Sequence, residues 1–60
     1  MTKNFEVEFF QRVGDDDAFV RMRVPADDAE TAVNDVKTGR IPHNSFVALW
    51  RVREVDDLEL

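Results

Sequence analysis

The sequence predicts an α+β domain with the element order β-β-α-β, in which a three-stranded antiparallel sheet (order 3-1-2) carries one helix packed on one face. Three observations lead to this fold. Two N-terminal segments alternate apolar and polar residues, a central segment repeats apolar residues at helical spacing, and a further apolar segment follows. No linker-like stretch divides the chain, so residues 1–60 are expected to form a single small domain.

The first two strands are predicted from period-two alternation in residues 4–13 and 18–24. Their apolar faces consist of Phe5, Val7, Phe9 and Val13 in the first segment, and of Ala18, Val20, Met22 and Val24 in the second. The stretch "GDDD" at 14–17 is typical of a hairpin loop. A four-residue loop there would pair Phe9 with Met22 in the core. On the opposite face the same register pairs Arg12 with Phe19, Phe10 with Arg21, and Glu8 with Arg23.

A helix of about three turns is predicted after Pro25. Asp27 is the expected N-cap, with Glu30 three residues later in the spacing of a capping box. The apolar stripe of this helix is Ala29, Ala32, Val33 and Val36. Lys37 falls in the last turn and Gly39 at the expected end. The helix connects strands two and three, so a right-handed crossover is expected, with strand one in the middle of the sheet.

The last strand, from about residue 46 to residue 55, is apolar on both faces at its start. Period-two alternation places Phe46, Ala48, Trp50 and Val52 on the helix side. On this reading Trp50 anchors the core. The alternative is an exposed Trp50 at the centre of a binding site, which requires a β-bulge that reverses the parity of the strand.

The other face of the sheet has no element to cover it, and it gathers aromatic, aliphatic and basic side chains. The candidate interface on this face is Phe10, Arg12, Phe19, Arg21, Arg23, Val47, Leu49, Arg51 and Arg53. Three interpretations stay open: a solvated sheet face, a protein-partner or homodimer interface, and a surface on which single-stranded nucleic acid stacks. The acidic residues lie mainly in the turn, on the helix and near the C-terminus, which makes the helix side a possible mimic of nucleic acid.

Composition narrows the function classes. The net charge of −5 disfavours a binder of nucleic acid without sequence preference. There is no Cys for a disulfide or a thiolate metal site, and no apolar run of membrane-spanning length. Asp15–Asp17 lack the spacing of a calcium loop, and His43 has no partner at catalytic or metal-binding spacing. We therefore expect a cytoplasmic, non-enzymatic protein with no cofactor, no metal and no small-molecule substrate.

The run "FEVEFFQRV…AFVRMRVPADDAETAV…FVALWRVREVD" resembles the DpnD/PcfM-like family of small accessory proteins of phages and mobile elements. The matching positions are Val24, Ala26, Asp27, Asp28, Ala29, Glu30, Ala32, Val52, Glu54 and Val55. Some small anti-CRISPR proteins are similar in the same way. The resemblance covers structural positions and implies a phage accessory protein that acts as a modulator or inhibitor by binding, in the cytoplasm of the host cell. The function expected is protein–protein interaction through the exposed sheet face, with nucleic-acid binding or mimicry as alternatives.

Overall fold

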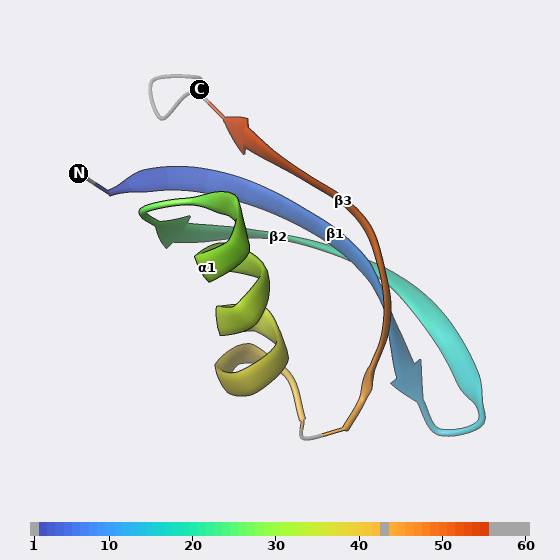
Figure 1. The fold of residues 1–60 in the computed structure, drawn as a ribbon. Coiled ribbons are helices and arrows are strands. Elements are labelled where there is room, and N and C mark those ends of the chain that lie inside the picture. The colour runs from blue at the N-terminus through green and yellow to red at the C-terminus, as the bar shows by residue number, and fades with distance from the viewer. Residues whose placement is uncertain (1, 43, 56–60) are drawn as a thin grey trace.

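The computed structural model describes residues 2–42 and 44–55, and its elements follow the predicted order (Figure 1). They are the strands β1 (Lys3–Val13), β2 (Asp16–Ala26) and β3 (Phe46–Val55), the helix α1 (Ala29–Asp35) and a π-helical turn η1 (Val36–Arg40). The strand order is β2-β1-β3, and β1 is antiparallel to both neighbours. This is the predicted α+β fold and the predicted 3-1-2 order, read from the opposite edge.

The hairpin between β1 and β2 is tighter than predicted. Val13 pairs with Asp16, which leaves only Gly14 and Asp15 in the loop. Gly14 has a φ of 64°, and a glycine with positive φ at the first loop position is typical of a type II′ turn. The predicted register was therefore wrong by two residues: Phe9 faces Val20 instead of Met22. A shift of two keeps every side chain on its predicted face but changes its neighbours across the strands.

The helix begins one residue later than predicted. Asp28 has extended backbone angles, and its carboxylate accepts a hydrogen bond of 2.8 Å from the Thr31 amide. Asp28 is thus the N-cap in place of Asp27, because two adjacent aspartates offer the same chemistry and only the first helical turn selects between them. The turn η1 ends at Arg40, directly after Gly39. Neither helical segment of the described chain has the length and apolar character that a membrane crossing requires.

The core lies between α1 and the part of the sheet where β1 starts and β2 ends. Its fully buried members are Val7 and Phe9 of the central strand, Val24 of β2, and Ala32 and Val36 of the helical segment. The β1–β2 hairpin extends beyond the helix (Figure 1), and Val13 next to its turn is exposed. The opposite face of the sheet is not covered by any described element.

Two irregularities in β3 change which side chains face the helix. Glu8 pairs with Arg51 but Phe9 pairs with Leu49, so Trp50 is an extra residue between them. A second shift, between Phe10 and Gln11, leaves Val47 as an extra residue in the same way. A bulge of this kind reverses the parity of a strand. No glycine or proline marks either position in the sequence, which is why simple alternation did not predict them.

The two irregularities put Ala48, Leu49 and Trp50 on the face opposite to the predicted one, and Ala48 lies on the outer face because it pairs with Phe10. Phe46 and Val52 pack against the core, as predicted. Leu49 lies on the helix side because it pairs with the buried Phe9, and it was wrongly placed on the outer face. Trp50 was wrongly placed in the core: its side chain contacts the ring of Phe10 and is 65% exposed.

Candidate functional site

The candidate site is the outer sheet face, meaning the face of the sheet turned away from α1. The central strand supplies its middle row, with Glu6, Glu8 and Phe10 at alternate positions. These three residues divide the face into two adjoining groups. The Arg–Glu network consists of Glu6, Glu8, Arg21, Arg51 and Arg53, and the aromatic cluster consists of Phe10, Phe19 and Trp50.

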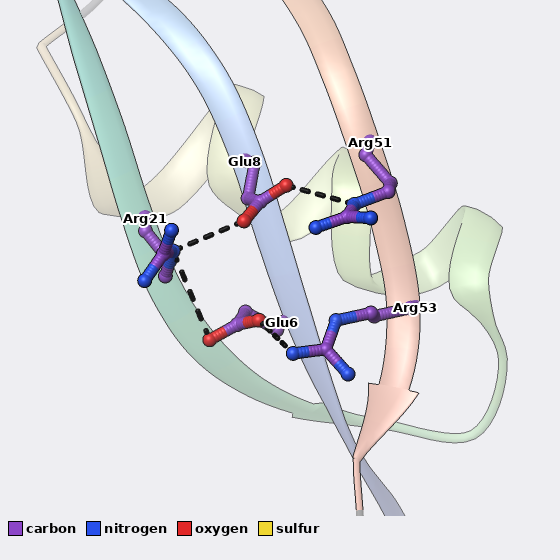
Figure 2. A network of polar contacts seen from close by, with 5 residues as sticks. All are labelled: Glu6, Glu8, Arg21, Arg51 and Arg53. Atoms are coloured by element: carbon purple, nitrogen blue, oxygen red, sulfur yellow. Dashed lines mark hydrogen bonds and ion pairs between the residues drawn. The ribbon is translucent and has the colours of Figure 1, made fainter.

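The Arg–Glu network crosses all three strands (Figure 2). Glu8 of β1 stands between Arg21 of β2 and Arg51 of β3 because the strand register pairs it with both. One carboxylate oxygen accepts a hydrogen bond of 2.9 Å from Nε of Arg51, and the other accepts one of 3.0 Å from Nε of Arg21. The Glu8 side chain is only 3% exposed, so the two guanidinium groups replace the water that burial removes from it.

Glu6 holds the second part of the network. Its carboxylate accepts a hydrogen bond of 2.7 Å from Nη2 of Arg53, and its other oxygen lies 4.0 Å from Nε of Arg21. Arg21 therefore bridges both carboxylates, as Figure 2 shows. Among residues 2–42 and 44–55, no buried polar side-chain atom lacks a hydrogen-bond partner. The charged groups of the network therefore bind one another, which indicates a structural role.

The hydrogen bond between Glu8 and Arg51 favours the charged form of both side chains. The hydrogen bond from Arg51 is the largest cause that lowers the pKa of Glu8, and the nearby charges of Arg51 and Arg21 act in the same direction. Burial acts against them but is outweighed. The same hydrogen bond raises the pKa of Arg51. Glu8 is consequently ionised at neutral pH and unsuited to donate or accept a proton in catalysis there.

The aromatic cluster adjoins the network toward the hairpin. Phe10 pairs with Phe19 across β1 and β2, and their rings meet edge to face at a centroid distance of 5.4 Å. The first irregularity of β3 brings Trp50 to the other side of Phe10, with a centroid distance of 6.1 Å and an interplanar angle of 89°. Phe19 is 48% exposed. The cluster is therefore an apolar surface with Phe10 as its partly buried base.

The predicted candidate residues are only partly brought together. Phe10, Phe19, Arg21, Arg51 and Arg53 share the outer sheet face, while Leu49 lies on the helix side. Arg12 lies near the hairpin, where its Nε donates a 2.8 Å hydrogen bond to Asp17. The remaining two are Arg23, which is opposite Glu6 in β2, and Val47, which is exposed at the second irregularity.

Sequence reasoning placed Glu6 and Glu8 on this face but missed their pairing, because the predicted hairpin register set Glu8 opposite Arg23. It also missed Trp50 as a member of the face, except as the alternative that required a bulge. The continuous apolar stretch "FVALW" is the one signal that could have pointed to a break in alternation.

A groove of about 690 Å³ lies on the opposite side of the sheet, between α1 and β3. Its lining includes Ala29 and Val33 of the helix together with Leu49 and Val52 of β3. Lys37 also lines it and extends over the ring of Phe46, 5.0 Å from its centroid. The groove is mainly apolar, and it lies directly beside the free edge of β3.

Within the described residues, no group of three or more His, Asp or Glu side chains could hold a metal ion. Asp16 and Asp17 belong to β2 rather than to the turn. His43 and the acidic residues of 56–60 lie outside the described residues. Comparisons with protein-family models, curated proteins and solved structures found no significant match, so the resemblance to the DpnD/PcfM-like family stays a prediction.

Proposed function

We propose that this chain is a non-enzymatic binding module that recognises a protein partner through the aromatic cluster on its outer sheet face. The observation that carries the proposal is the joint exposure of Phe19 and Trp50 at 48% and 65% around Phe10. Large aromatic side chains that remain exposed in contact with one another are typical of the centres of protein interfaces. A cytoplasmic location and a modulating or inhibitory role form part of the same proposal.

The Arg–Glu network supports a particular kind of partner. Three arginines surround two carboxylates, so the network retains a formal charge of +1 beside the aromatic cluster. Each of the three arginine side chains is still more than half exposed while it binds a Glu. A partner surface with an apolar side chain bordered by a carboxylate would complement both groups.

Nucleic-acid binding by the same face has less support from the geometry. Arg21, Arg51 and Arg53 already donate to Glu6 or Glu8, so a phosphate would compete with carboxylates fixed a hydrogen bond away. Mimicry by the helix side is also weakened, since Asp28 caps α1 and Asp35 accepts a 2.7 Å hydrogen bond from Arg40.

The experiment compares interaction partners of four versions of the chain in cells: wild type, Phe19→Ser, Trp50→Ser and Val13→Ser. Val13 is the matched control, because it is 56% exposed and apolar but lies at the hairpin, away from the cluster. Cross-linking and mass spectrometry should recover a protein with wild type and Val13→Ser that both other variants lose. An identical set of partners for all four would refute the proposal. Salt-sensitive binding of a single-stranded oligonucleotide that depends on Phe19 would favour nucleic acid instead.

A further inference from the structure

β3 is one of the two edge strands of the described sheet, and the other is β2. β3 pairs with β1 on one side, and no described strand pairs with its other side. Of the five large apolar side chains that are exposed in the described chain, three belong to this strand: Val47, Leu49 and Trp50. The unpaired N–H and C=O groups of an edge strand are a template for pairing with another strand, but β-bulges oppose regular pairing. A second strand can therefore pair with β3 only in a register that accommodates both irregularities.

At positions 46, 48, 49, 50 and 52 of β3, the order of faces is symmetric about Leu49. Phe46 and Val52, three residues before and after it, lie on the helix side with Leu49 itself. Ala48 and Trp50, the direct neighbours of Leu49, both lie on the outer sheet face, since Ala48 pairs with Phe10 and Trp50 contacts its ring. The two irregularities create this symmetry, because regular alternation would have put Phe46 and Leu49 on opposite faces.

We propose that two copies of this chain associate through β3, antiparallel to one another, about a two-fold axis at Leu49. Such an axis sets Leu49 beside Leu49, Ala48 beside Trp50, and Phe46 beside Val52 of the other copy. Each pair then lies on one face of the continuous sheet, as an antiparallel ladder requires. The result is a six-stranded sheet with an isologous interface.

The groove between α1 and β3 gives the second copy a place to bury its side chains. Leu49 is 43% exposed and lines this groove beside Val52 and Val33. At the two-fold axis the Leu49 side chains of both copies meet at the open border of the two grooves. The apolar lining that each chain leaves open is thereby covered by the same residues of the other.

Repulsion between the arginines of β3 favours antiparallel over parallel pairing of the two copies. With the axis at Leu49, Arg51 lies opposite Val47 of the second copy, and the two Arg51 side chains are four residues apart, about 13 Å along the strands. This exceeds the screening length of about 8 Å at physiological ionic strength. A parallel pairing would instead set Arg51 beside Arg51 and Arg53 beside Arg53, at the spacing of neighbouring strands.

The size of the contact predicts a weak dimer. A ten-residue strand is roughly 33 Å long, and a sheet with its side chains is about 10 Å thick, so the edge covers roughly 330 Å² of each copy. Stable interfaces bury about 800 Å² per partner. The edge alone supplies less than half of that area, and we therefore expect a dimer that forms with rising protein concentration.

Sedimentation velocity from micromolar to near-millimolar protein tests the inference. Wild type should shift from monomer to dimer over this range. Leu49→Lys and Leu49→Glu should each stay monomeric, with the dissociation constant raised at least about tenfold, because like charges would meet at the axis. A mixture of the two variants should dimerise again. Val13→Lys, which adds the same charge away from β3, should behave as wild type.

Each other outcome contradicts the proposal. A wild type that is monomeric at the highest concentration excludes this dimer, and so does a mixture of the Leu49 variants that stays monomeric. Phe19→Ser distinguishes this inference from the proposed function, because Phe19 lies on β2 and should leave the dimer intact. If Phe19→Ser dissociates the dimer and Leu49→Lys does not, self-association uses the aromatic cluster instead.

Discussion

Replacement of Trp50 by Ala is the perturbation that best separates the observed structure from the one that simple alternation predicts. Trp50 is the only Trp of the chain and would be the natural core anchor of a small domain. Truncation of a buried Trp or Phe to Ala typically lowers the free energy of unfolding by about 3–5 kcal/mol. In the structure Trp50 is 65% exposed, so only about a third of its surface is covered.

The expected cost of Trp50→Ala follows from that covered third. An aromatic side chain of this size buries up to ~250 Å² when fully enclosed, and a third of that area at ~25 cal/mol per Å² corresponds to about 2 kcal/mol. The figure is an upper limit, because the unfolded chain also covers some of this surface. We therefore expect a loss of about 1–2 kcal/mol from burial, and about 0.5–1.5 kcal/mol more from the edge-to-face contact with Phe10.

Phe9→Ala provides the comparison, because Phe9 is fully buried and stacks on Phe46 at a centroid distance of 5.5 Å. Phe9→Ala is expected to lower the free energy of unfolding by about 3–5 kcal/mol. This is comparable with the entire free energy of unfolding of a domain of this length, which is about 3–9 kcal/mol. Phe9→Ala is therefore close to the limit of what the fold tolerates, and Phe9→Leu, with an expected loss of about 1–1.5 kcal/mol, supplies a folded variant at the same site.

Urea unfolding followed by circular dichroism at low micromolar protein measures these losses without a contribution from dimer formation. The indole of the wild type should also be accessible to acrylamide in a fluorescence quenching experiment. The reasoning is refuted if Trp50→Ala costs as much as Phe9→Ala, or if the indole is shielded in the monomer. Either result would mean that Trp50 lies in the core and that β3 has no bulge at this position.

Three further predictions concern the sheet and the helix. Glu8→Gln should remove a pH-dependent part of the stability: because the pKa of Glu8 is lowered in the folded state, its contribution is present above about pH 4.5 and is lost as the pH falls through the folded value. Urea midpoints of wild type and variant should converge toward low pH, and a constant difference would contradict the lowered pKa. Gly14→Ala should cost about 1 kcal/mol, since Gly14 has a φ of 64° and an added Cβ would meet no atom within 4 Å, so backbone strain alone acts. Gly14→Asn should cost less in the same assay, and equal losses would argue against a left-handed residue here. Asp28→Ala should lower the unfolding midpoint more than Asp27→Ala, because only Asp28 accepts the hydrogen bond from Thr31; the reverse order would restore Asp27 as the N-cap.

The order of the elements, the strand order of the sheet and the faces of β1 and β2 were all predictable from the sequence. These follow from local periodicity: every second residue from Phe5 to Phe9 is apolar, and the spacing of Ala29, Ala32, Val33 and Val36 is helical. Even the wrong hairpin register preserved the faces of both strands, because a shift of two residues does not change which way a side chain points.

Which residues meet on the outer sheet face depends on the pairing of all three strands. The pairing of Glu8 with Arg21 depends on a loop of two residues instead of four, and "GDDD" is compatible with both. The exposure of Trp50 depends on the first of the two irregularities in β3, which follows the curved central strand (Figure 1). Nothing local marks them, since "FVALW" is apolar at every position and satisfies either face. The physical reason is that local patterns fix the direction of a side chain within its own strand, whereas contact between strands depends on a register set by the packing of the whole sheet.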